Sequence, residues 1–207
     1  MRNAFLTLAL VCFISRAAAQ QRDPADNDTP PQVIGIAHHA EMIGQLIADA
    51  TFVAPNGKET TLSSYRGRPL LIDLWATWCG PCLTALPALN SIYSEVKDKG
   101  LQMISFDEAG DPVDEDRDAA RAIKYLARHQ YTWKNFHDSD HKVATALQAD
   151  GLPLVVLIDA NGQIVYYDSG KEADLRKAIA SLGPEFAPGT PSGQSKPAES
   201  QNAPAQN

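Results

Sequence analysis

The chain has 207 residues, of which 25 are acidic and 18 basic, and its formal net charge at neutral pH is −7. This charge argues against a protein that binds nucleic acid by electrostatic attraction. Three cysteines are too few for a fold stapled by disulfides, whereas 44% hydrophobic residues are typical of a globular core.

The first 19 residues have the pattern of a secretory signal peptide. Arg2 precedes an apolar run at 4–15, and a group of small residues ends at Ala19. The run is shorter than the roughly 20 residues that cross a membrane. We therefore expect export with cleavage near Ala19; the alternative is retention of the segment as an anchor. Cleavage would remove Cys12 and leave two cysteines in a periplasmic chain that is not inserted in the membrane.

The rest of the chain is expected to form one domain between two polar segments. Residues 20–47 begin with a stretch rich in proline and aspartate that predicts a flexible leader, and 33–47 form either a short helix or a loop. Residues 48–182 have the patterns of a compact domain. Residues 183–207, rich in proline, serine and glutamine, predict a disordered tail.

Strand patterns occur at both ends and in the middle of this domain. Asn56-Gly57 and Asn161-Gly162 each separate two short strand-like segments and predict hairpin turns. Continuous apolar runs predict central strands at 70–75 and 101–106. A short extra strand is expected at 132–136.

Helical patterns lie between these strands. Four helices are expected, at 82–97, at 119–127, around 143–147 with Gly151 closing it, and at 169–182 behind a capping box formed by Ser169 and Glu172. The acidic run at 108–118 is expected to be a solvated loop whose last acids cap the next helix. The alternation of strands and helices predicts an α/β fold with a mixed sheet.

Two cysteines follow the first central strand, in the motif Trp78-Cys79-Gly80-Pro81-Cys82. A helix that begins here offers free N–H groups and a positive dipole end, which stabilise a thiolate at Cys79. Cys82 lies one turn further on, close enough for a Cys79–Cys82 disulfide. Cys79 is thus the candidate nucleophile and Cys82 the candidate resolving thiol. A zinc site would need His137 and His141 as well, far along the chain, so we expect no metal.

Asp73 is the one ionisable residue in the first central strand. Burial should raise the pKa of its carboxyl, so that it can exchange a proton with Cys82. The alternative is a solvated aspartate at the end of a strand.

Residues 71–82 resemble the active-site strand and helix of thioredoxins, and Asp73 matches their buried aspartate. The signal peptide, the first hairpin and an inserted helix and strand near 117–137 are similar to the extracytoplasmic TlpA/ResA-like branch. The resemblance implies a thioredoxin fold with an N-terminal hairpin and an inserted helix–strand element. It places Ser105 beside Asp73, where thioredoxins carry a lysine.

The resemblance also implies a surface that binds the substrate. Gly151-Leu152-Pro153 resembles the cis-proline loop of the family, where the backbone of Leu152 pairs with an extended substrate and Pro153 faces the cysteines. Trp78, Gly80 and Pro81 complete this surface.

These features predict a thiol–disulfide oxidoreductase that uses its own Cys79–Cys82 disulfide and needs no cofactor. The Gly-Pro pair resembles that of reducing thioredoxins, so we expect a reductase. Its expected substrates are disulfides of exported proteins, such as apocytochromes c, and a membrane thiol donor would supply its electrons. We expect the protein to be a monomer. The alternatives are a disulfide oxidase or isomerase and a redox-independent binding module or chaperone.

Overall fold

The computed structural model describes residues 36–54, 57–108 and 115–187. The predicted signal peptide, the start of the leader and all but the first residues of the predicted tail lie outside these ranges, as does Asn56 of the first predicted turn. In the described part of the chain, no helix has both the length and the apolar character needed to cross a membrane.

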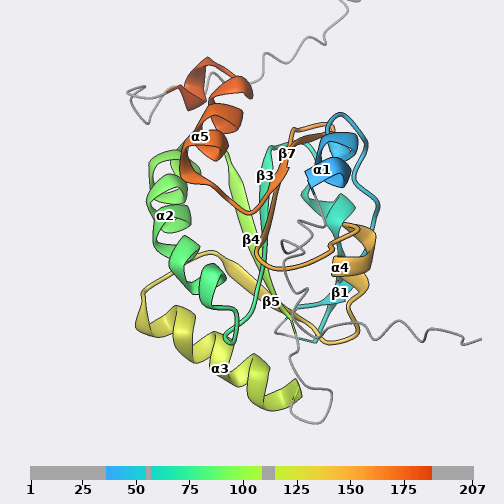
Figure 1. The fold of residues 1–207 in the computed structure, drawn as a ribbon, viewed down its shortest axis with the longest axis vertical. Helices are drawn as coiled ribbons and strands as arrows, with labels where there is room; N and C mark the ends of the chain where they lie inside the picture. The colour runs from blue at the N-terminus through green and yellow to red at the C-terminus, as the bar shows by residue number, and fades with distance from the viewer. Residues whose placement is uncertain (1–35, 55–56, 109–114, 188–207) are drawn as a thin grey trace, which may run out of the picture. The chain divides into compact units, whose positions relative to one another are not determined.

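A five-stranded mixed sheet, with strand order β5-β4-β3-β6-β7, forms the centre of the fold (Figure 1). The central strand β3 (Leu70–Trp75) is buried along its whole length and runs parallel to β4 (Gln102–Glu108) and antiparallel to β6 (Leu154–Ile158). The outer strands are β5 (Lys134–Asp138), parallel to β4, and β7 (Ile164–Asp168), antiparallel to β6. The predicted α/β fold with a mixed sheet is confirmed.

Three helices cover one face of the sheet, and they lie together on one side of it in Figure 1. They are α2 (Gly80–Val96), α3 (Glu115–Arg128) and α5 (Glu172–Ser181). Their apolar side chains pack with Leu71 and Trp75 of β3 in a core that also contains both cysteines of the motif. The reactive motif is therefore built into this face of the sheet.

The opposite face is covered by α1 (Ile36–Met42), α4 (Lys142–Ala146) and a hairpin of β1 (Thr51–Val53) and β2 (Glu59–Thr61). Leu70, Ile72 and Leu74 of β3 supply the other half of the core. Three 3₁₀ helices complete the described elements, at Leu62–Tyr65, Lys97–Lys99 and Pro184–Phe186. Of the two possibilities for residues 33–47, the structure contains a helix.

Two expected helix boundaries are wrong. Helix α4 ends at Ala146, earlier than a helix closed by Gly151. Gln148, with φ of 54°, takes the left-handed position expected for that glycine. The N–H of Ala149 then donates to the carbonyl of Ala144. Helix α5 begins after Lys171 without a side-chain cap, because Gly170, with φ of 80°, turns the chain between the two members of the expected capping box.

Candidate active site

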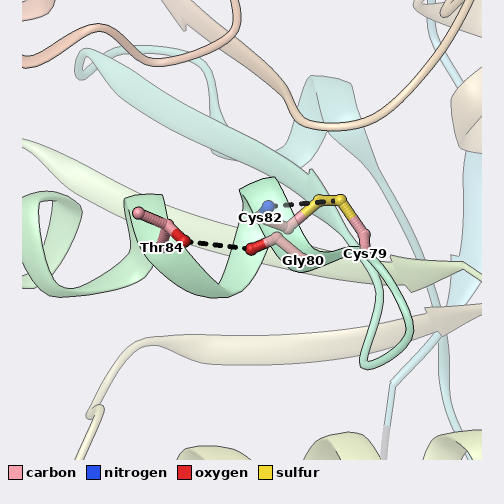
Figure 2. Close-up of a disulfide and its surroundings, with 4 residues drawn as sticks. All are labelled: Cys79, Gly80, Cys82 and Thr84. Atoms are coloured by element: carbon pink, nitrogen blue, oxygen red, sulfur yellow. Dashed lines mark hydrogen bonds between the residues drawn. A yellow bond between two sulfur atoms is a disulfide. The ribbon is translucent and has the colours of Figure 1, made fainter.

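The two cysteines lie at the first turn of α2, immediately after β3. Cys79 is the N-cap residue, its Sγ accepts a hydrogen bond from the backbone N–H of Cys82 at 3.2 Å, and the two residues form a disulfide (Figure 2). Their Cα atoms are 5.3 Å apart, within the range for unforced disulfides. Pro81 stands at a first-turn position that needs no N–H donor.

The two sulfur-bearing residues differ in their access to solvent. Cys79 is 6% exposed and Cys82 is 1% exposed, because Cys82 faces the core between α2 and the sheet. Donation of the Cys82 N–H to Cys79 Sγ, and the positive end of α2, both favour negative charge on that sulfur. The arrangement can therefore carry a reactive thiolate at Cys79 and a shielded second thiol at Cys82.

Two residues expected to contact a substrate, Trp78 and Leu152, lie on the same pocket. Trp78 is 57% exposed, although it is a large aromatic residue next to a buried cysteine. Leu152 packs against the core that contains Cys79 and Cys82, and the Leu152–Pro153 peptide bond is cis. Of the predicted substrate-facing residues, the structure thus places Trp78 and Leu152 on one pocket.

Asp73 is 1% exposed, in the middle of β3. Side chains alternate along a strand, so the Asp73 carboxyl shares the face of Leu71 and Trp75, against which Cys82 packs. Within the described residues its Oδ2 has no hydrogen-bond partner. Burial raises the pKa of Asp73 to about 7. A carboxyl group that titrates near neutrality can both accept and return a thiol proton.

The neighbour of Asp73 on β4 is Ser105, in the register that the resemblance to thioredoxins implied. Ser105 Oγ lies 2.6 Å from Asn135 Oδ1, to which it donates, and accepts a hydrogen bond from Trp133 Nε1 at 3.0 Å. Its single proton is thereby committed to Asn135. The residue that replaces the lysine of thioredoxins consequently supplies neither a charge nor a donor to Asp73.

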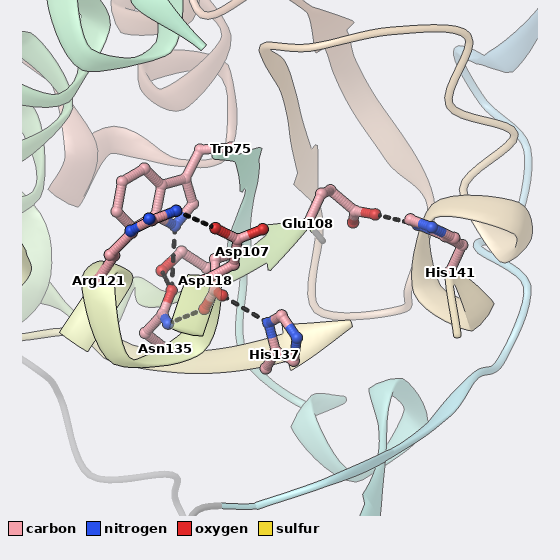
Figure 3. Close-up of polar contacts among 9 residues, drawn as sticks. Trp75, Asp107, Glu108, Asp118, Arg121, Asn135, His137 and His141 are labelled. Atoms are coloured by element: carbon pink, nitrogen blue, oxygen red, sulfur yellow. Dashed lines mark hydrogen bonds and ion pairs between the residues drawn. The ribbon is translucent and has the colours of Figure 1, made fainter. Parts of the chain in front are cut away.

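A buried polar network, which the sequence did not reveal, extends from Asn135 on β5 (Figure 3). Asn135 Oδ1 also accepts from Trp75 Nε1 at 3.0 Å, and Asn135 Nδ2 donates to Asp107 Oδ1 at 2.5 Å. His137 Nδ1 lies 2.6 Å from the second oxygen, Asp107 Oδ2. Burial raises the pKa of Asp107, against the hydrogen bonds from Asn135 and His137. The network ties β5 and β4 to the end of β3 just before the cysteine motif.

The expectation of a solvated loop is wrong at the first residue of the acidic run, Glu108; residues 109–114 lie outside the described ranges, and the last acids lie in the first turn of α3, as expected. Glu108 is the last residue of β4, is 6% exposed, and its Oε2 lies 2.7 Å from His141 Nδ1 (Figure 3). Asp118, in α3, is 5% exposed and forms an ion pair with Arg121. Each buried carboxylate is paired with a basic side chain: Glu108 with His141 beside α4, and Asp118 with Arg121 in α3. The acidic composition of the run did not indicate these pairs.

The two histidines considered for a zinc site bind carboxylates on different faces of the sheet. His137 contacts Asp107 on the α3 side, whereas His141 contacts Glu108 on the α4 side. Among the residues that the structure describes, no group of three or more His, Cys, Asp or Glu side chains is placed to hold a metal ion.

Comparisons with known proteins agree with this geometry. A family model described as Redoxin matches residues 42–182. Thiol-disulfide oxidoreductase ResA of Geobacillus kaustophilus is 27% identical over 147 residues, which cover 70% of this chain and 80% of that protein. ResA of Geobacillus thermodenitrificans is 26% identical over 147 residues, with the same coverage of both chains.

A solved structure gives the same result. The putative thiol:disulfide interchange protein DsbE from Chlorobium tepidum superposes with a TM-score of 0.58 at 25% identity, covering 68% of this chain and 98% of that one. The region matched by the family model contains the mixed sheet, α2 and the Cys79–Cys82 disulfide. The chain belongs to the Redoxin family and is a thiol–disulfide oxidoreductase of the TlpA/ResA-like group of thioredoxin-fold proteins.

Proposed function

We propose that this protein reduces disulfides of exported proteins, with Cys79 as the nucleophile and Cys82 as the resolving thiol. The single observation that carries the proposal is the asymmetry of the pair: Cys79 lies at the N-cap of α2 and is the more exposed, whereas Cys82 is buried behind it. Although both cysteines are largely buried, this asymmetry supports attack through Cys79 rather than through Cys82.

The reaction proceeds by two thiol–disulfide exchanges. The Cys79 thiolate attacks a substrate disulfide, a Cys79–substrate bond forms, and the first substrate sulfur leaves as a thiolate. The Cys82 thiolate then attacks Cys79 Sγ and releases the second substrate sulfur, so that two electrons pass to the substrate and the Cys79–Cys82 disulfide is left. A membrane thiol donor returns the two electrons, and no other cofactor is required.

Asp73 is proposed to take the proton of Cys82 during the second exchange. Its burial on the face where Cys82 packs, and its pKa of about 7, support this role, because the carboxylate is then basic enough to accept the proton at neutral pH. The acceptor serves the step in which the buried thiol must become a thiolate.

The substrate is proposed to lie as an extended peptide across Trp78, Gly80, Pro81, Leu152 and Pro153. The exposed indole of Trp78 and the position of Leu152 beside it support this placement. Export to a periplasm is supported by the signal-like pattern of residues 1–19, and apocytochromes c are one class of exported substrate that the resemblance suggests.

Two measurements test this function. In an insulin-reduction assay, Cys79→Ser should abolish turnover; equal activity of parent and variant would instead indicate a redox-independent binding module. The reduction potential, from equilibration with glutathione, tests the direction. A reduction potential of about −270 mV, as in thioredoxin, supports a reductase. A potential of about −120 mV, as in strongly oxidising catalysts, would instead indicate an oxidase.

A further inference from the structure

A pocket that the exchange chemistry does not use adjoins the reactive motif through Trp78, the residue before Cys79. It has a volume of about 360 Å³, and Trp78 and Leu152, which flank the reactive motif and the cis-proline, form part of its wall. A peptide held by these two residues would therefore have a neighbouring side chain at the mouth of the pocket. The size and position suit one side chain of a substrate.

A buried carboxylate oxygen without a partner marks the polar part of the wall. Glu108, which lines the pocket, has a side-chain exposure of 6%, and its Oε2 is bound to His141 Nδ1. Within the described ranges, its Oε1 is buried and has no hydrogen-bond donor. A buried carboxylate oxygen without a donor is costly, so a cation that a ligand brings into the pocket would stabilise Glu108.

The charges around the pocket favour a cation. Asp150 joins Glu108 on the wall; among the basic groups, His141 contacts Glu108, and His39 Nε2 lies 3.8 Å from Asp150 Oδ1. Asp138 on β5 is the register partner of Glu108. Its two carboxylate oxygens already accept the N–H groups of Val143 and Ala144 at the start of α4. Near Glu108, Asp138 thus adds negative charge without competing for a ligand.

Most of the remaining wall is apolar, and in the described part of the chain Thr145 is its one further polar side chain. Trp78, Ala144, Ala149 and Leu152 line the pocket together with Glu108. A largely apolar pocket with a carboxylate on its wall fits a long side chain with an aliphatic stem and a cationic head, as in lysine and arginine. The indole face of Trp78 adds an attraction for the same cation. A purely apolar side chain would leave Glu108 Oε1 unpaired, and an acidic one would be repelled.

We propose that this pocket is a specificity subsite that binds a lysine or arginine side chain next to the target cysteine of the substrate, with Glu108 receiving the cationic head. The inference rests on the proposed exchange at Cys79. It makes the protein selective for disulfides with a basic neighbour rather than for exposed disulfides in general.

The test uses single-cysteine peptides joined by a disulfide to thionitrobenzoate, whose release is followed by absorbance. The peptides are identical except for one residue, Arg, Gln or Glu, scanned over the two positions on either side of the cysteine. Burial raises the pKa of Glu108 to about 7, so the reduced full-length chain is assayed at pH 8.5, where this carboxyl is ionised. A charge-assisted hydrogen bond predicts a preference of about tenfold for the Arg peptide over the Gln peptide at the best position, expressed mainly in KM.

The variants locate this preference. In Glu108→Gln the ratio of the Arg and Gln rate constants should fall to near one, and because it is a ratio it does not depend on the fraction of folded protein. Glu185→Gln removes the same charge from an exposed residue of the last 3₁₀ helix and should keep the wild-type ratio.

The outcomes separate the subsite from the exchange reaction. Equal rate constants for all three peptides at every position in the wild-type protein would overturn the subsite and leave the proposed function standing. A tenfold preference that persists in Glu108→Gln would also overturn it. Absence of thionitrobenzoate release with every peptide would overturn the proposed function together with the subsite.

Discussion

Asp73 and Ser105 face each other across the parallel β3–β4 pair, and the serine hydroxyl donates to Asn135 rather than to the buried aspartate. The carboxyl therefore lies in the core without a compensating cation on this strand, and burial raises its pKa to about 7. This relationship governs both the stability of the fold and the proposed handling of the Cys82 proton.

Asp73→Asn should stabilise the oxidised protein, and more so at high pH. An ordinary aspartate titrates near 3.8, and Asp73 near 7, so the folded state binds the extra proton and its stability falls as the pH rises from about 4 to about 7. Replacement by a neutral amide removes that penalty, a gain of up to about 4 kcal/mol above pH 7 that vanishes near pH 4. Urea unfolding at pH 4, 6 and 8 measures it. An equal effect of the substitution at all three values would contradict the assignment.

The same substitution should slow the second exchange. Without a carboxylate to accept the Cys82 proton, release of the substrate from Cys79 should lose its dependence on a group titrating near pH 7, while the first attack by Cys79 keeps its rate. Rapid-mixing measurements of mixed-disulfide formation and decay between about pH 5.5 and 9 separate the two steps. An unchanged pH profile for decay would remove Asp73 from the proton transfer.

Asn135→Ala should destabilise the protein strongly, although Asn135 is far from the cysteines in sequence. The truncation leaves Trp75 Nε1, Ser105 and Asp107 without their shared partner. Each buried unpaired group costs about 1–3 kcal/mol, and partial relaxation leaves an expected loss of about 2–4 kcal/mol. Gln45→Ala, which removes an exposed amide bound to the Glu41 carbonyl, is the control and should change stability by less than about 0.5 kcal/mol. Similar losses for both variants would show that the network contributes nothing.

Gly170→Ala should cost more than Gly44→Ala, because only the first adds a steric clash to backbone strain. Gly170 has φ of 80°, and a Cβ there would lie 2.7 Å from Cγ2 of Val155. Gly44 has φ of 84°, and a methyl group at this position would have nothing within 4 Å. We expect about 1 kcal/mol for Gly44→Ala and about 2–4 kcal/mol for Gly170→Ala. Equal costs in denaturant unfolding would mean that Val155 moves aside freely.

Local patterns in the sequence predicted the elements that carry the cysteines. The apolar run of β3 and the motif at the start of α2 are contiguous, so their geometry follows from short-range rules. Asn161-Gly162 likewise predicted the β6–β7 hairpin. The Asp73–Ser105 register followed from a resemblance that extends over both strands.

The features that the sequence did not predict depend on contacts between distant segments. Glu108 is buried because His141, 33 residues away in sequence, covers it, and the acidic residues around it gave the opposite indication. Asn135 joins three elements through hydrogen bonds that no periodicity records. The end of α4 was misplaced because Gln148, rather than a glycine, adopts the left-handed conformation.

The central claim is that Cys79 begins the exchange and Cys82 resolves it. Trapping the mixed disulfide tests this claim most directly. Reduced Cys82→Ser is mixed with a disulfide peptide, and the product is mapped by mass spectrometry after alkylation, with Cys79→Ser as the matched control. We predict a stable peptide adduct on Cys79 in Cys82→Ser and none in Cys79→Ser. A peptide adduct on Cys82 in Cys79→Ser, formed at a comparable rate, would contradict this assignment.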